Sequence, residues 1–317
     1  MLKGVGMSYK KTALIGTIQK FSTEDGDGIR STVFFKGCPL KCKWCHNPEL
    51  IEIRNQIIVN PSKCIKCYEC IKICPDSAIY ENREELAVDW SLCSNCYACT
   101  EVCYANAIMP VAKEMTVREI MEIIEQDKVF YENTGGGVTL SGGEVFIHHE
   151  FAEELIKACA LENIKVCLDT SGFAQYEVIS KLCSYENVTD ILYDIKHIND
   201  KQHKQYTGVS NNLIILNLKK LSAVPEIRKK IWLRMPLISS VNDDDINIMQ
   251  ARALFVECGL KKLSLICYHE LGSTKATHIG ADYIKFRPPD RERLYKIKNC
   301  FEEVGIEIEI IGENWSS

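Results

Sequence analysis

Short apolar runs alternate with longer amphipathic stretches along most of the chain. The apolar runs are rich in β-branched residues, and they predict strands at 31–37, 137–143, 164–172, 190–196, 230–238 and 261–269. Stretches between them, such as HEFAEELIKACALEN and DINIMQARALFVECG, have the apolar spacing of amphipathic helices. Repeated strand–helix units of this kind indicate a parallel sheet covered by helices.

Six such units predict an α/β fold, which we expect to be a partial (β/α)6 barrel of the TIM type. An open, doubly wound sheet is the alternative. In either arrangement, the loops after the C-terminal ends of the strands carry the chemistry. The predicted divisions are residues 1–59 for the start of the barrel, 60–110 for an inserted domain, and 111–317 for the rest of the barrel.

The predicted insert contains an internal repeat. KCIKCYECIKICPDSAI (63–79) is followed after 29 residues by LCSNCYACTEVCYANAI (92–108), and both carry the spacing C-x2-C-x2-C-x3-C. This spacing is typical of ferredoxins with two cubane clusters, in which the fourth cysteine of each run binds the other cluster. A pair of zinc knuckles is the alternative, but zinc modules rarely place four cysteines so closely twice. The predicted ligand sets are Cys64, Cys67, Cys70 and Cys103, and Cys93, Cys96, Cys99 and Cys74.

A second group of cysteines follows the first predicted strand, in GCPLKCKWCHNP (37–48). Cys38, Cys42 and Cys45 have the spacing C-x3-C-x2-C, and the next cysteine is Cys64. A cubane cluster normally takes four protein ligands, so three thiolates leave one iron free. An amino acid that chelates through its amino and carboxylate groups would fill that position.

Polar residues also follow the other predicted strands. Each has an ordinary explanation: Gly142–Gly143–Glu144 as a turn, Asp194 and Lys196 as an ion pair, His269 as a hydrogen-bonded histidine. Polar groups at the ends of apolar strands are costly unless they are paired or used. Their presence after nearly every strand therefore predicts a shared site. Its further members are Asp169, Thr170 and Arg234.

Composition narrows the class of protein. Of 317 residues, 46% are hydrophobic and 26% charged, which is ordinary for a globular protein. The net charge of -5 gives no basic excess for nucleic acid, and we expect neither a nucleic-acid nor a membrane partner. The 17 cysteines, without a recognisable signal sequence, indicate metal ligation in a reducing, cytoplasmic compartment.

The string DGDGIRSTVFFKGCPLKCKWCHNPE resembles the signature of glycyl radical enzyme activating enzymes, a family of the radical S-adenosylmethionine (SAM) superfamily. SGGE, LDTSG, YDIK and YHELG follow in the order expected for that family, so the resemblance covers nearly the whole chain. The insert resembles the subgroup that serves dehydratases, decarboxylases and lyases. Prolines usual in the family are replaced here by Asp27, Val145 and Tyr104.

The resemblance implies three [4Fe-4S] clusters, one of which binds SAM on Cys38, Cys42 and Cys45. It also implies a monovalent cation near Asp169, together with Thr170, Leu192 and Asp194. The residues implied to contact SAM are Trp44, Cys45, His46, Gly142, Gly143, Glu144, the motif Asp194–Ile195–Lys196, Arg234 and His269.

The resemblance further implies a reaction under anaerobic conditions. One electron cleaves SAM, and the resulting 5′-deoxyadenosyl radical takes a hydrogen atom from a glycine of a partner glycyl radical enzyme. A flavodoxin or ferredoxin would supply the electron, and the two insert clusters would relay it, or else be structural or help to dock the partner. Two other functions stay open: a radical SAM enzyme that modifies a peptide or small molecule directly, and a non-catalytic electron carrier.

Overall fold

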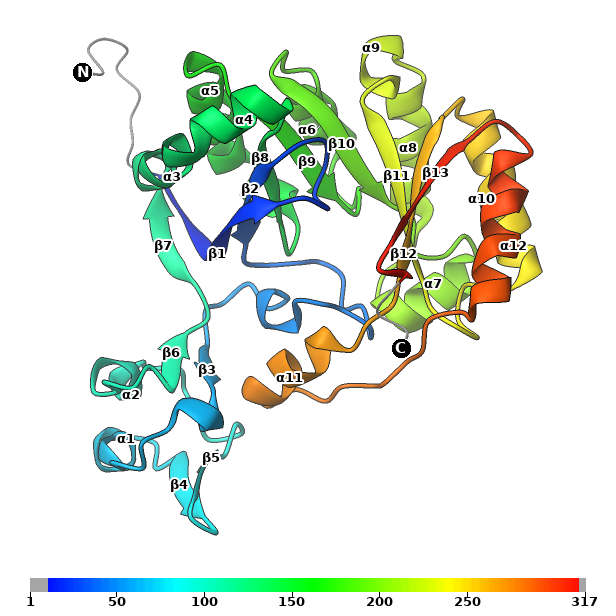
Figure 1. The fold of residues 1–317 in the computed structure, drawn as a ribbon. Helices are drawn as coiled ribbons and strands as arrows, with labels where there is room; N and C mark the ends of the chain where they lie inside the picture. The colour runs from blue at the N-terminus through cyan, green and yellow to red at the C-terminus, as the bar shows by residue number, and fades with distance from the viewer. Residues whose placement is uncertain (1–10, 314–317) are drawn as a thin grey trace.

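A nine-stranded sheet forms the centre of the protein, whose computed structural model describes residues 11–313 (Figure 1). Each of the six predicted strands is present, and the predicted parallel sheet is confirmed, since β2 and β8 to β13 run parallel. β1 lies antiparallel between β2 and β7. The order across the sheet is β13 (Glu307–Ile311), β12 (Lys262–Cys267), β11 (Ile231–Leu237), β10 (Val188–Asp194), β9 (Lys165–Thr170), β8 (Gly137–Gly142), β2 (Arg30–Phe35), β1 (Thr12–Ser22) and β7 (Lys113–Thr116).

Helices between the strands cover the sheet and bury a continuous apolar core. α3 begins at a capping box, in which Thr116 and Glu119 satisfy each other's backbone N–H groups. Leu155 of α5 and Leu168 of β9 illustrate the core, since both are fully buried. The helices are α3 (Val117–Ile124), α4 (Lys128–Thr134), α5 (His149–Leu161), α6 (Tyr176–Cys183), α7 (Asp200–Thr207), α8 (Asn212–Ser222), α9 (Pro225–Arg228), α10 (Asp245–Glu257), α11 (Leu271–His278) and α12 (Arg291–Glu302).

The insert forms a small unit with its own core at one side of the sheet (Figure 1). Its repeat is visible in the backbone, since Tyr68 and Tyr97 both have left-handed φ angles, 58° and 66°, and each precedes a short helix. Ile57 and Ile108 lie in its core. Its elements are β3 (Ile57–Val59), α1 (Glu69–Ile73), β4 (Ile79–Asn82), β5 (Glu85–Val88), α2 (Ala98–Glu101) and β6 (Ile108–Pro110), with β3 paired to β6 and β4 to β5.

The register of the parallel strands brings their C-terminal ends to one edge. Phe35 of β2 pairs with Gly142 of β8, and Asp194 of β10 pairs with Arg234 of β11. Side chains far apart in the chain therefore meet where these strands end. Among residues 11–313, no helix is both long enough and apolar enough to cross a bilayer.

Candidate functional site

A cavity of about 240 Å³ lies where the central parallel strands end. Its walls come from the loop after β2 and from the ends of β8, β9, β10 and β11. The gathering of polar residues expected from the sequence is therefore present in the structure. The predicted site residues that line the cavity are Cys38, Cys42, Trp44, Cys45, His46, Gly142, Gly143, Asp169, Thr170, Asp194, Lys196 and Arg234.

The loop with the cysteine triad is held from its first residue onward. Gly37 N donates to the carbonyl of Leu50 at 2.7 Å, and Cys38 N donates to that of Ile51 at 2.8 Å. Leu50 ends the short 3-10 helix η1 (Pro48–Leu50). The segment after the triad thus folds back on its beginning, which fixes the backbone around the first thiol.

The three thiols of this loop are free and face the cavity. Burial raises the pKa of Cys45 to about 12, and burial also raises the pKa of Cys38 and Cys42. Within residues 11–313, no three His, Cys, Asp or Glu side chains converge tightly enough to hold a single metal ion. A cube of four irons spreads its thiolates wider than one ion does, and iron binding displaces the thiol protons. The triad therefore fits a cluster better than a mononuclear site.

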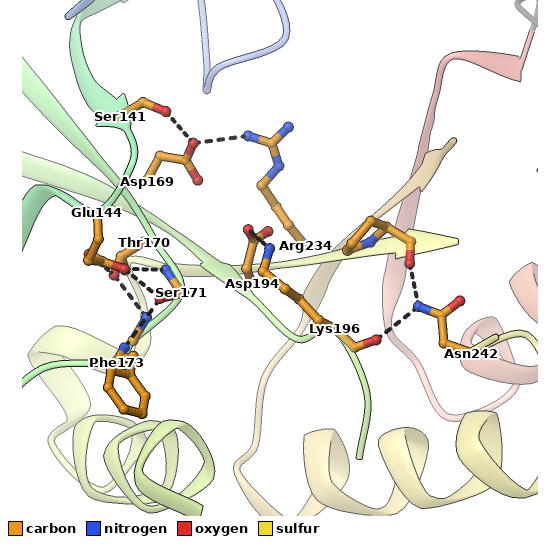
Figure 2. Close-up of polar contacts among 12 residues, drawn as sticks. Ser141, Glu144, Asp169, Thr170, Ser171, Phe173, Asp194, Lys196, Arg234 and Asn242 are labelled. Atoms are coloured by element: carbon orange, nitrogen blue, oxygen red, sulfur yellow. Dashed lines mark hydrogen bonds and ion pairs between the residues drawn. The ribbon is translucent and has the colours of Figure 1, made fainter. Parts of the chain in front are cut away.

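Opposite charges line the far wall of the cavity. Lys196 Nζ lies 2.7 Å from Asp194 Oδ2, and Arg234 Nη1 lies 3.8 Å from Asp169 Oδ2 (Figure 2). Ser141 Oγ donates to the same Asp169 oxygen at 2.6 Å. Burial lowers the pKa of Lys196, but Asp194 and the nearby thiols of Cys42 and Cys38 together raise it by more, so the ammonium stays charged. Burial raises the pKa of Asp169 to about 6, although the neighbouring Arg234 opposes that rise.

One donor on this wall lacks a partner. Arg234 Nε is buried and makes no hydrogen bond within the part of the chain that the structure describes. A buried, unsatisfied donor carries a desolvation cost of about 1–3 kcal/mol. Arg234 lines the cavity, so the carboxylate of a bound amino acid would satisfy it. This orphaned donor fits the amino-acid end of SAM.

Two histidines stack at the mouth of the triad loop. The ring centroids of His46 and His269 lie 3.6 Å apart with planes inclined at 30°. Burial lowers the pKa of His46 to about 3 and also lowers that of His269, so both rings are neutral. His269 therefore borders the cavity through His46, although His269 itself is outside the cavity lining.

Comparison with known proteins places the chain in a family. The model of the radical SAM superfamily matches residues 93–251, and models of a 4Fe-4S dicluster domain and a 4Fe-4S single cluster domain match 56–119 and 24–78. The trans-4-hydroxy-L-proline dehydratase activating enzyme of Clostridioides difficile is 42% identical, covering 94% of this chain and 99% of that protein. The chain belongs to the glycyl radical enzyme activating enzymes.

Other relatives of this activating enzyme agree. The choline trimethylamine-lyase activating enzyme of Oleidesulfovibrio alaskensis is 36% identical, covering 95% of this chain and 99% of that protein. A radical SAM methyltransferase from Sphaerobacter thermophilus has a similar fold, with a TM-score of 0.56 at 15% identity, over 94% of this chain and 77% of that one. The names of the relatives include dehydratases, lyases and decarboxylases as the enzymes that those relatives activate.

Glu144 of the activating enzyme lies behind the cavity wall. Its side chain is buried and accepts hydrogen bonds from Thr170 Oγ1 at 2.7 Å, Ser171 N at 2.9 Å and Ser171 Oγ at 2.5 Å (Figure 2). Both of these residues line the cavity. Glu144 thus shapes the turn after β9, and its contact with the amino group of SAM stays a prediction.

Replacing Glu144 with glutamine is expected to weaken SAM binding. The amide nitrogen would face donors of Thr170 and Ser171, at a cost of about 1–3 kcal/mol. We expect the KM for SAM to rise about tenfold, which corresponds to about 1.4 kcal/mol, with iron content unchanged. Steady-state SAM cleavage measures this, with Glu150→Gln on the exposed side of α5 as the control. An unaltered KM in the Glu144 variant would contradict a shaping role.

Ile195 does not face the cavity. Its side chain is buried in the main core, and its backbone N–H donates to the carbonyl of Arg234 at 2.8 Å. Its predicted role in cofactor binding can therefore involve only its backbone, and it stays a prediction. Leu192, predicted near the cation, is likewise buried in β10.

Sequence analysis missed Asp25, which lines the cavity and lies 4.0 Å from Arg234 Nη1. Thr32 Oγ1 donates to its carboxylate at 2.7 Å. The loop that carries it is held by Arg30, which is fully buried and donates to the carbonyl of Asp27 at 3.1 Å and to that of Val138 on β8 at 2.8 Å. The sequence signal for this arrangement was in the DGDGIR motif. Arg30 of the motif begins an apolar strand, and a charged residue there must be paired with polar groups such as those of the loop that carries Asp25.

The insert's cysteines lie in two groups, and their role as cluster ligands stays a prediction. Cys64, Cys67, Cys70 and Cys103 line one small cavity, although Cys103 comes from the second repeat. Burial raises the pKa of Cys70, and Cys103 adds to that rise. Burial likewise raises the pKa of Cys93, with Cys74 and Cys96 adding to it, and that of Cys99, with Cys93 and Cys96 adding to it.

Proposed function

We propose that this activating enzyme holds a [4Fe-4S] cluster on Cys38, Cys42 and Cys45, with SAM on its fourth iron. One observation carries the proposal: three free thiols and the orphaned Nε of Arg234 share one cavity. Two further clusters occupy the insert, on the two sets of four cysteines. The fold is a partial (β/α)6 barrel interrupted by a ferredoxin-like domain, which covers the predicted residues 60–110 together with β3 (Ile57–Val59), because β3 pairs with β6 in the core of the insert.

A cluster held by Cys38, Cys42 and Cys45 would supply one electron for the cleavage of SAM to methionine and a 5′-deoxyadenosyl radical, and that radical would take a hydrogen atom from a glycine of the partner enzyme. The protein's residues orient SAM and exclude water. Lys196 and Arg234 provide positive charge for its carboxylate, and Gly142 and Gly143 let the backbone approach closely. Apolar lining by Phe34, Leu40, Ile51 and Ile266 keeps the cavity dry.

A monovalent cation beside Asp169 belongs to the same proposal. Three carboxylates, those of Asp25, Asp169 and Asp194, face two basic side chains on this wall. The excess negative charge supports a cation there, with Thr170 nearby. The carboxylate of SAM would then face a wall on which the positive and negative charges are equal in number.

The physiological partner is a glycyl radical enzyme of the dehydratase, decarboxylase or lyase type, and the electron donor is a flavodoxin or ferredoxin. The relatives' names support this class of partner. The insert's two cysteine sets support a relay of the electron to the catalytic cluster. We place the protein in the cytoplasm, where thiols stay reduced.

An anaerobic mixture with the glycyl radical enzyme encoded nearest to this gene tests the function. We expect about twelve irons per chain and a glycyl radical doublet on the partner in electron paramagnetic resonance, dependent on SAM. A new bond in a small molecule or peptide, without a protein radical, would overturn the assignment. So would the absence of a doublet with every glycyl radical enzyme of the same organism.

A further inference from the structure

Helix α11 touches both the catalytic loop and the insert, and it lies between them in Figure 1. At one end, Gly272 packs so closely on Cys45 that a Cβ would lie 2.2 Å from the Cys45 carbonyl oxygen. Just beyond the other end, a Cβ on Gly280 would lie 2.0 Å from Trp90 Cδ1. An eight-residue helix rises about 12 Å, so the two contacts are that far apart.

The contact with the catalytic loop is reinforced by charge. Lys275 Nζ of α11 donates to Asn47 Oδ1 at 2.6 Å and lies 3.2 Å from Glu49 Oε1. His269, two residues before the helix, stacks on His46. These contacts fall on Cys45 and on the residues that directly follow it, so α11 cannot move without disturbing the loop that carries the third thiol.

The contact with the insert reaches the second cysteine repeat. Trp90 and Cys93 share one turn, in which Cys93 N donates to the carbonyl of Asp89 at 3.3 Å. Asn95, two residues later, accepts from Ile57 N at 3.1 Å. A cavity bordered by Cys93 also reaches Leu14 of β1 and Glu114 of β7. The second repeat therefore faces the main sheet.

The first repeat lies farther out. Figure 1 shows α1 and the β4–β5 hairpin at the tip of the insert. Ile65, beside Cys64, is 67% exposed, and Tyr104, beside Cys103, is 92% exposed. Cys67 of the set Cys64, Cys67, Cys70 and Cys103 is exposed, as is Cys96 of the second repeat, so the place of the first repeat at the tip is what opens this set to an approaching protein.

We propose that Trp90 is a positioning residue which, through Gly280 and α11, holds the inner cysteine set beside the catalytic loop for electron delivery. The inner set is Cys74, Cys93, Cys96 and Cys99, and the outer set takes the electron from the donor. This proposal rests on the electron relay of the proposed function, and it adds the order in which the outer and inner sets pass the electron. Per turnover, the donor loses one electron and SAM gains one, so the insert ends as it began. The rate of electron tunnelling falls steeply with the distance between donor and acceptor. A small shift of the inner set therefore slows electron delivery to the catalytic cluster.

Gly280→Ala tests this proposal. Its methyl group meets Trp90 Cγ, Cδ1 and Nε1, and Cγ lies on the χ2 axis, so a rotation of the ring about χ2 does not relieve the contact and the side chain has to shift as a whole. We expect reduction of the catalytic cluster by reduced flavodoxin, followed by freeze-quench electron paramagnetic resonance, to slow at least about tenfold. SAM cleavage driven by a photoreduced small-molecule flavin, which reaches the catalytic cluster directly, should stay within about twofold, with full iron content.

Gly305→Ala is the matched control, because Gly305 has φ 75° against 67° for Gly280 but no atom of residues 11–313 within 4 Å of its Cβ. It should leave both rates unchanged, and Trp90→Phe should retain most of the flavodoxin-driven rate. Normal flavodoxin-driven reduction in Gly280→Ala, or equal loss of both rates, overturns the positioning role. Normal reduction in Cys96→Ser as well would instead remove the relay itself.

Discussion

Replacing Cys45 with alanine abolishes SAM cleavage, by about a thousandfold or more, with every reductant. Two thiolates cannot hold a cube whose fourth iron must stay free for SAM, because clusters are held by cysteine thiolates. Iron content is expected to fall from about twelve to about eight per chain, since the insert's cysteines are untouched. Iron analysis and the release of methionine measure both effects.

Cys300→Ala is the control for this variant. Cys300 is a free cysteine of α12, partly exposed, whose thiol lies 3.8 Å from Met249 Sδ on α10. Its replacement should change neither iron content nor SAM cleavage. Retained SAM cleavage in Cys45→Ala would remove the cluster site on which the proposed function depends.

Replacing Gly143 with alanine should destroy the catalytic site while sparing the insert. A Cβ there would lie 2.0 Å from the carbonyl oxygen and 2.6 Å from the carbonyl carbon of Gly37, the residue before Cys38. These are backbone atoms, so no side chain can give way, and overpacking costs about 1–3 kcal/mol or more. The apparent unfolding temperature should fall, and the catalytic iron should be lost.

Gly135→Ala is the control for Gly143→Ala. Gly135 has φ 76°, yet a Cβ there meets nothing closer than Lys165 Nζ at 4.0 Å. This variant carries backbone strain without a clash, so it should bind its full iron. If Gly143→Ala also kept all three clusters, the close contact between β8 and the catalytic loop would not support the site.

Much of the fold follows from the sequence, because periodicity reports which face of an element is buried. All six central strands could be predicted in this way, and the two cysteine repeats from the spacing of their cysteines. β1 and β13 could not. β13 (EIEII) is an edge strand and β1 lies next to the edge strand β7, so few of their positions are fully buried and neither forms a continuous apolar run.

The candidate site, like the fold, could be predicted from the sequence only in part. Residues at strand ends could be placed, because parallel strands bring their C-terminal ends together. The inward or outward direction of Glu144 and Ile195 could not, since it depends on hydrogen bonds made after folding. The packing of Gly280 on Trp90 was also beyond sequence reasoning, because these residues are far apart in the chain and share no motif.

The neck of the insert has an evolutionary consequence. The chain leaves the main sheet and returns to it along one antiparallel ribbon, in which Ile57 pairs with Pro110. Asn55 closes the base of this ribbon, with its side chain bonded to both the N–H and the carbonyl of Ala112. A segment with adjacent ends can be gained, lost or exchanged as a cassette without re-threading its host. A different cluster-bearing insert could therefore replace this one, and it would deliver electrons to the catalytic loop if it made the same contact with α11.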